Sequence, residues 1–130
     1  MIEIAKHSTG SKGIFQKDIA KNQELSVKYL DHIIHSLKAT GLIINSGGKK
    51  NGYSLTRKPK DITIMDIHNA FEPGICVIDC MSDAVQCSRS NHCAAKGFWG
   101  GLNNIVIEYF NAITLQDILN DQSLIDDVQR

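Results

Sequence analysis

The sequence lacks cysteine over most of its length, and it lacks any long apolar run. All four cysteines fall within the 18 residues from 76 to 93, and the remaining 112 of the 130 residues contain none. No segment approaches the ~20 consecutive apolar residues of a membrane-spanning helix, and the start does not resemble a signal peptide. We therefore expect a cytoplasmic protein with no membrane partner. In that reducing compartment, clustered cysteines indicate metal binding or redox chemistry rather than structural disulfides.

The chain also lacks net charge, but its charges are unevenly distributed. Residues 1–60 hold 11 Lys and Arg against 4 Asp and Glu, a balance of +7, whereas residues 61–130 hold 3 against 10, a balance of −7. This asymmetry indicates that the first half binds a polyanion, and nucleic acid is the obvious one. The alternative interpretation is a chance unevenness of solvated charges.

The basic half has the pattern of a helix-turn-helix. Residues 1–7 look like the end of an amphipathic helix, and residues 14–20 predict about two further helical turns. Ser26 is placed to cap a longer helix, whose apolar positions repeat at helical spacing from Leu30 to Leu37. Gly41 is a natural stop for that helix.

A β-hairpin is expected to follow the second helix. Residues 42–44 and 53–56 are typical of two short strands, joined by a loop that carries three glycines and two lysines. A helix-turn-helix with such a hairpin, or wing, predicts a DNA-binding unit. Its candidate DNA-binding residues are Ser26, Lys28, Tyr29 and Asp31 in the first two turns of the second helix, and Lys49, Lys50 and Tyr53 in the wing. Read individually, Tyr29 also fits a core position and Asp31 a first-turn carboxylate favoured by the helix dipole.

The cysteine spacing differs from that of a zinc ribbon. Cys80, Cys87 and Cys93 are separated by six and five residues, without CxxC pairs. Three thiolates on a loop can surround an iron–sulfur cluster, which needs a fourth ligand. Candidates for that ligand are Cys76, His92, Asp79, Asp83 and a residue of a partner chain. Structural zinc and metal-free thiols that sense oxidants by forming disulfides remain alternatives. Cys76 lies between two apolar residues, so we expect it to be buried rather than ligating.

The acidic half is expected to be mostly helical around the cysteine loop. Thr63 with Asp66 has the spacing of a capping box and opens a helix to about residue 71, and Thr114 with Asp117 caps a short helix through about residue 119, after which the end is frayed. Between them lies a long apolar stripe, which we interpret as a homodimerisation helix rather than as core. Its residues are Trp99, Leu102, Val106, Tyr109 and Phe110.

These patterns predict a mainly α protein, with a winged helix-turn-helix domain, a small β-wing and a long C-terminal dimerisation helix. We expect residues 1–60 to bind DNA, and residues 61–130 to carry the cysteine loop and the dimer contact. An enzyme, such as a thiol oxidoreductase, is disfavoured because there is neither a CxxC motif nor a phosphate-binding glycine loop. A zinc-stabilised or metal-free winged-helix interaction module is the other alternative.

The motifs together resemble the IscR/NsrR/RirA group of bacterial winged-helix transcription regulators, of the Rrf family, over nearly the whole chain. The resemblance implies a homodimer built on the long helix after the cysteines. Such a two-fold dimer is expected to bind a pseudo-palindromic DNA operator, and we expect a repressor rather than an activator. It also implies a [2Fe–2S] or [4Fe–4S] cluster on Cys80, Cys87 and Cys93, which is not always retained in the isolated protein. The most specific segments are Gly52-Tyr53-Ser54-Leu55, the three cysteines, Phe98-Trp99, and residues 114–119.

Three departures from the group's pattern bear on the site. The group's first helix begins about a dozen residues earlier, so we expect Met1 to fall inside it. Lys96 stands where the IscR branch has a histidine ligand, and lysine is a poor iron ligand. Gly47 replaces a wing arginine, so any minor-groove contact is expected from Lys49 or Lys50.

Overall fold

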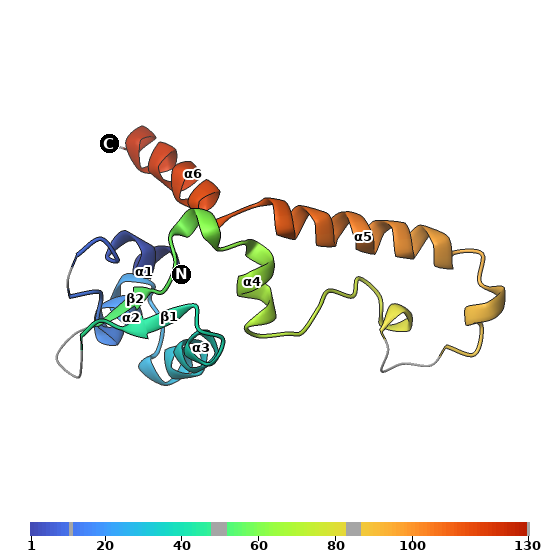
Figure 1. Ribbon diagram of the computed structural model, residues 1–130, viewed down its shortest axis with the longest axis horizontal. Helices are drawn as coiled ribbons and strands as arrows, with labels where there is room; N and C mark the ends of the chain where they lie inside the picture. Colours follow the sequence, from blue (N-terminus) through green and yellow to red (C-terminus); the bar gives the residue numbers. More distant parts are fainter. Residues whose placement is uncertain (11, 48–51, 83–86, 130) are drawn as a thin grey trace.

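The computed structural model describes residues 1–10, 12–47, 52–82 and 87–129. Six helices and two strands follow one another along the chain (Figure 1). They are α1 (Ile2–Lys6), α2 (Gln16–Asn22), α3 (Val27–Ala39), β1 (Ile43–Asn45), β2 (Tyr53–Leu55), α4 (Ile64–Asn69), α5 (Lys96–Ala112) and α6 (Leu115–Val128), with 3-10 turns η1 (Pro59–Asp61), η2 (Asp79–Met81) and η3 (Ser90–His92).

Helix α3 forms as its sequence predicts. The Ser26 hydroxyl accepts a hydrogen bond from the Tyr29 backbone N–H at 3.1 Å, which caps the first turn. Leu30, Ile34 and Leu37 are buried along one face. The helix gives way to Gly41 in the left-handed region, φ +72°, a conformation that favours glycine.

The wing is a two-stranded antiparallel sheet with an additional bridging residue. Ile43 pairs with Leu55 and Asn45 with Tyr53, while Ile14 forms an isolated antiparallel bridge to Tyr53. Ile14 and Tyr53 exchange two backbone hydrogen bonds of 3.1 and 2.8 Å. The prediction of helix from residue 14 was therefore wrong by two residues, because Ile14 bonds to the wing and α2 begins only at Gln16.

One apolar core holds the winged helix together. It joins α1, α2, α3 and the wing to the segment before α4 and to the first residue of α6. Its buried members are Ile4, Ala5, Ile14, Ile19, Ala20, Leu30, Ile34, Leu37, Leu42, Ile43, Ile62 and Leu115. Ile62 and Leu115 are also linked by a backbone hydrogen bond of 2.8 Å, so the start of α6 is fixed to this core.

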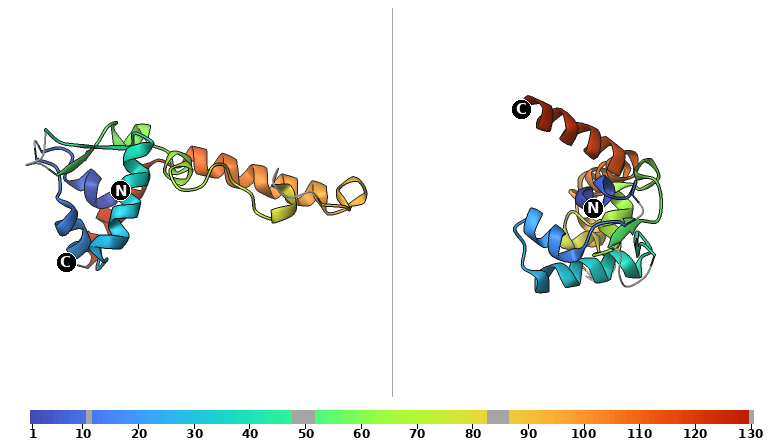
Figure 2. Two further views of the ribbon diagram at one scale, coloured as in Figure 1. Left: turned by 90° about the horizontal axis from the view of Figure 1, so that it is seen from below. Right: turned by 90° about the vertical axis from the view of Figure 1, so that its left-hand side faces the viewer.

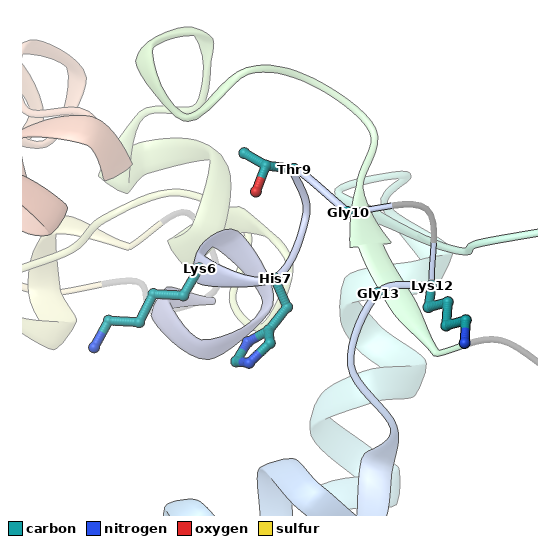
Figure 3. A pocket seen from close by; sticks show the side chains of 6 residues that line it. All are labelled: Lys6, His7, Thr9, Gly10, Lys12 and Gly13. Carbon is teal, nitrogen blue, oxygen red and sulfur yellow. The ribbon is translucent and has the colours of Figure 1, made fainter.

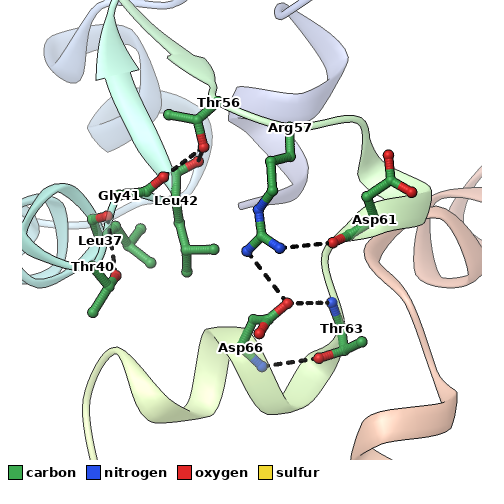
Figure 4. A network of polar contacts seen from close by, with 9 residues as sticks. All are labelled: Leu37, Thr40, Gly41, Leu42, Thr56, Arg57, Asp61, Thr63 and Asp66. Atoms are coloured by element: carbon green, nitrogen blue, oxygen red, sulfur yellow. Dashed lines mark hydrogen bonds and ion pairs between the residues drawn. The ribbon is translucent and has the colours of Figure 1, made fainter.

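A polar network leads from the wing into α4 (Figure 4). Thr63 and Asp66 form the predicted capping box. Arg57, at the exit of the wing, donates to the Asp61 carbonyl at 3.0 Å and reaches the Asp66 carboxylate at 3.4 Å. The Thr56 hydroxyl donates to the carbonyl of Gly41, which ties the end of β2 to the end of α3.

Helix α5 extends away from the winged-helix body, and the cysteine segment runs outward beside it (Figures 1 and 2). None of its 17 residues is buried, although α4 packs against it. Helix α6 is longer than expected, because it continues to Val128 instead of ending near residue 119. Its sequence after residue 119 contains neither glycine nor proline, so nothing terminates the helix, and Asp126 reaches Lys6 of α1 at 3.7 Å. Within the described residues, no helix combines the length and apolarity needed to cross a membrane.

Candidate DNA interface and cysteine pocket

The start of α3 presents an exposed polar surface. Lys28, Asp31 and His32 are exposed, and Tyr29 is 58% exposed beside Val27 at 52%. Tyr29 is therefore not a core residue, which removes the main alternative to a DNA contact for this side chain. Ser26 is also exposed, but its hydroxyl already caps α3.

Asp31 is engaged by a residue that the sequence analysis missed. The Gln16 side-chain amide, in the first turn of α2, donates to the Asp31 carboxylate and also reaches the Val27 carbonyl at 3.4 Å. Only the packing of α2 against α3 brings these residues together, so the sequence offered no indication of the pair. Gln16 thus orients the one carboxylate on the proposed recognition surface.

A hollow of about 490 Å³ separates α3 from the wing. Lys38 lies on its wall with its ammonium 5.8 Å from the ring centroid of half-buried Tyr53. Tyr53 therefore has a structural contact in addition to any contact with DNA. Lys49 and Lys50, predicted at the wing tip, lie outside the described residues.

A second basic surface lies beside the wing (Figure 3). Lys6, His7 and Lys12 line a shallow pocket of about 410 Å³ in the loop between α1 and α2. The Lys12 carbonyl accepts a hydrogen bond of 2.8 Å from Gly52, so this loop and the wing are joined. None of these residues was predicted as a DNA contact, although Lys6 and Lys12 contribute to the +7 balance of residues 1–60.

Three of the four cysteines line one small cavity at the start of α5. The cavity is formed by Cys80, Met81, Cys87, Ser90, Cys93, Lys96 and Trp99. All four thiols of the chain are free of disulfides. The cysteines predicted as cluster ligands, which are spread over 14 residues from 80 to 93, are thus brought together.

Of the candidate fourth ligands, Cys76, Asp79 and His92 lie outside this cavity wall, and Asp83 falls outside the described residues. Cys76 is exposed and its thiol donates to the Ile78 carbonyl at 3.0 Å, so the expectation that it is a buried apolar residue was wrong. The reason is that its segment runs along the outside of α5, where Val77 rather than Cys76 is held by a hydrogen bond to Asn103. His92 is exposed within η3 and does not line the cavity.

The donor atoms of this cavity fit an iron–sulfur cluster, whereas its volume in this structure is too small for one. Thiolates are the usual cluster ligands, and three free thiols share this wall. The cavity volume is only about 20 Å³, room for about one water molecule. Among the residues that the structure describes, no three Cys, His, Asp or Glu side chains are grouped closely enough to hold one metal ion. The three thiols therefore line one cavity but are not arranged as a metal site in this structure.

Helix α5 has two different apolar faces. Trp99 lines the cysteine cavity, Asn103 bonds to the cysteine segment, and Phe110 meets the His68 ring of α4 edge to face at 5.7 Å. The other face carries Phe98, Ile105 and Tyr109, which are 64–66% exposed. Of the residues predicted for dimerisation, Tyr109 is exposed, whereas Trp99, Leu102, Val106 and Phe110 are half-buried within the chain itself.

Comparison with known proteins places these features in one family. Residues 1–121 match the Rrf2 family model, described as an iron-dependent transcriptional regulator. The chain is 32% identical to Protein rrf2 of Nitratidesulfovibrio vulgaris over 124 residues, which is 95% of this chain and 82% of the relative. The fold is similar to that of CymR, the global cysteine regulator of B. subtilis, with 28% identity, a TM-score of 0.72, and coverage of 92% of this chain and 86% of that one.

A solved structure of IscR from T. potens is similarly related. It is 27% identical with a TM-score of 0.71, and the match covers 93% of this chain and 78% of that chain. The expected fold class is thereby confirmed, and the relatives are transcriptional regulators rather than enzymes. The chain belongs to the Rrf2 family of transcriptional regulators, proteins that bind DNA.

Proposed function

We propose that this regulator is a homodimeric repressor whose DNA binding is controlled by an iron–sulfur cluster on Cys80, Cys87 and Cys93. One observation carries the proposal: three free thiols converge on one cavity at the first turn of α5. Bound there, a cluster would supply a group whose charge and presence respond to iron and oxidants. Its fourth ligand would come from His92, Cys76 or a partner chain.

DNA is proposed to lie across the start of α3 and the wing. Lys28 and Tyr29 are exposed there, and Asp31 is held by Gln16 where a recognition helix meets base edges. Lys12 is added to the predicted contacts, because its carbonyl is bonded to Gly52 of the wing. Lys28 and Lys12 would contact phosphates, whereas Asp31 can accept from the amino group of cytosine.

The proposed dimer forms along the exposed face of α5. Phe98, Leu102, Ile105, Tyr109 and Ala112 are spaced by alternating steps of four and three, which is the repeat of a coiled-coil seam. This seam shares Leu102 and Tyr109 with the set predicted from sequence. A two-fold axis through such a seam would present two α3 helices to the half-sites of a palindrome.

The geometry suggests how the cysteine pocket acts on DNA binding. The pocket lies at the start of α5, and the winged helix lies at the opposite end of this helix (Figure 1). Because α5 has 17 residues with a rise of about 1.5 Å each, the two are about 26 Å apart. The Val77 N–H donates to the Asn103 side chain of the helix, and Trp99 of the helix lines the cysteine cavity. Ordering this loop would fix the outer half of α5, and with it the spacing of the two recognition helices in a dimer.

The test begins with protein purified without air and reconstituted with iron and sulfide. We expect visible absorption with bound iron and acid-labile sulfide, and loss of both when Cys80, Cys87 or Cys93 is replaced by alanine. Ser88→Ala is the control, because Ser88 is exposed in the same loop and does not line the cavity, whereas Cys76→Ala tests Cys76 as the fourth ligand. Titrating operator DNA with cluster-loaded and cluster-free protein then tests whether the cluster controls DNA binding. Equal affinity and equal sequence preference of the two forms would refute that control.

A second candidate is a cluster-free regulator that responds through its thiols. It is favoured by the convergence of three unpaired thiols in one cavity, where two could be oxidised to a disulfide. Colourless protein whose DNA affinity changes on oxidation would support this candidate. Colourless protein that retains zinc would instead support a structural metal site.

A further inference from the structure

The cysteine cavity has a polar side that no cysteine provides. Lys96 and Ser90 line it together with the thiols, and among the described residues of its wall Lys96 is the only charged one. The Lys96 ammonium donates a hydrogen bond of 3.0 Å to the Ser90 hydroxyl. The other residues of the wall are the three cysteines, Met81 and Trp99.

Each member of this pair is tied to a different cysteine through the backbone. The Ser90 N–H bonds to the Cys87 carbonyl at 3.1 Å, and the Lys96 N–H bonds to the Cys93 carbonyl at 3.2 Å. The side-chain bond between Lys96 and Ser90 therefore closes a ring that contains two of the three proposed ligand residues. Breaking that bond removes a side-chain link between the Cys87 turn and the first turn of α5.

We propose that Lys96, held by Ser90, positions the Cys87 and Cys93 thiols and raises the reduction potential of the cluster that they bind. This inference rests on the proposed cluster-binding function. Lysine is a poor iron ligand while it is charged. A positive charge at the cavity wall would, however, stabilise the reduced state of a cluster, which is more negative than the oxidised state. When dithionite donates one electron, one negative charge is added at the cysteine site, and the ammonium favours that reduced state.

The size of the effect is limited by solvent. Lys96 is exposed, so water and salt screen its charge as they screen surface ion pairs. We expect Lys96→Met to lower the ratio of reduced to oxidised protein at a fixed potential by about threefold, which is about 28 mV at 59 mV per tenfold. The difference from wild type should shrink in high salt, which a purely packing role would not cause.

Four variants separate charge from positioning. Lys96→Met loses both charge and donor, Lys96→Arg keeps both, and Ser90→Ala keeps the charge but loses its anchor. Arg89→Met is the matched control, because Arg89 is an exposed cation of the same loop that does not line the cavity. Midpoint potentials are measured by spectroelectrochemistry with dithionite, and cluster retention by the rate of colour loss in excess chelator.

We expect Lys96→Met to have a lower reduction potential and to lose its colour faster than wild type. Ser90→Ala should also lose its colour faster, with a smaller change of potential. Lys96→Arg and Arg89→Met should behave as wild type does. A Lys96→Met protein that holds its cluster at the wild-type potential and rate would overturn the inference. An equal shift in Arg89→Met would also overturn it, since the effect would then not be specific to the cavity. Wild-type protein that binds no cluster after reconstitution would instead refute the proposed function, an outcome visible before any variant is compared.

Discussion

At the scale of single residues, the wing depends on glycine where two backbones meet. Gly52 donates to the Lys12 carbonyl at 2.8 Å and lies directly against the backbone of Ile14. A Cβ added to Gly52 would overlap the Ile14 backbone, which cannot rotate away as a side chain can. At position 41, by contrast, an added Cβ would meet no atom within 4 Å, and glycine is favoured there only because φ is positive.

Gly52→Ala should therefore destabilise the protein more than Gly41→Ala does. We expect the free energy of unfolding to fall by about 3 kcal/mol for Gly52→Ala, because the wing has to separate from Ile14. For Gly41→Ala we expect about 1 kcal/mol, the usual cost of a left-handed alanine. Urea unfolding followed by circular dichroism measures both. Equal losses in the two variants would mean that the contact between wing and loop is dispensable.

Lys28 offers a residue-scale test of the DNA surface. Lys28→Ala should weaken binding to all DNA sequences alike and reduce the slope of log affinity against log salt by about one, because one phosphate contact is lost. Lys60→Ala, an exposed lysine in η1, is the control and should leave the slope unchanged. Fluorescence anisotropy at several salt concentrations provides the data. A Lys28→Ala protein with an unaltered slope would remove Lys28 from the interface.

At the scale of elements, the sequence predicted those features that form between residues close together in the chain. The Ser26 cap and both capping boxes were predictable because each joins a side chain to a backbone N–H only three positions away. The Ile14 bridge to Tyr53 was not, because its partners are far apart in the sequence. Cys76 was misjudged because two apolar neighbours say nothing of where the segment lies in space. The Gln16–Asp31 pair likewise requires α2 to be packed on α3 before it exists.

The capping box of α6 makes its stability dependent on pH. The Thr114 backbone N–H and then its hydroxyl, both 2.8 Å from the Asp117 carboxylate, hold the pKa of Asp117 below its ordinary value of 3.8. A lowered pKa in the folded state means that the carboxylate stabilises the fold above pH 3.8, and that this stabilisation is lost as pH falls through the lowered pKa.

Asp117→Asn should accordingly be less stable than wild type at neutral pH, and the difference should disappear in strong acid. Thermal unfolding between pH 2 and 7 measures the melting temperature of both proteins. Asp121→Asn, on the same helix but outside the capping box, is the control and should show no comparable trend. A constant difference between Asp117→Asn and wild type across this range would contradict the carboxylate's role.

At the scale of the whole molecule, the helix that leaves the body is the feature that monomeric packing does not explain. Helix α5 buries no residue completely, yet Phe98, Ile105 and Tyr109 expose about two thirds of their surface on the face away from α4. The opposite face is already used, by Asn103 for the cysteine segment and by Phe110 for His68. The exposed face is therefore available to a second copy without disturbing the cysteine pocket.

Ile105→Glu tests this arrangement, because it places two carboxylates in the proposed seam of each dimer, where they lose water without gaining a partner. We expect the mass in solution to fall from twice the 14.4 kDa of the chain to a single chain. Affinity for a two-half-site operator should fall by roughly a hundredfold, since the second half-site is no longer bound intramolecularly.

Asn104→Glu adds the same charge at the adjacent exposed position, outside the repeat of the seam, and should remain dimeric. Light scattering and operator binding distinguish the cases. If Ile105→Glu remains a dimer, the copies meet elsewhere; if it is monomeric but binds the operator as wild type does, two-fold pairing does not govern DNA recognition.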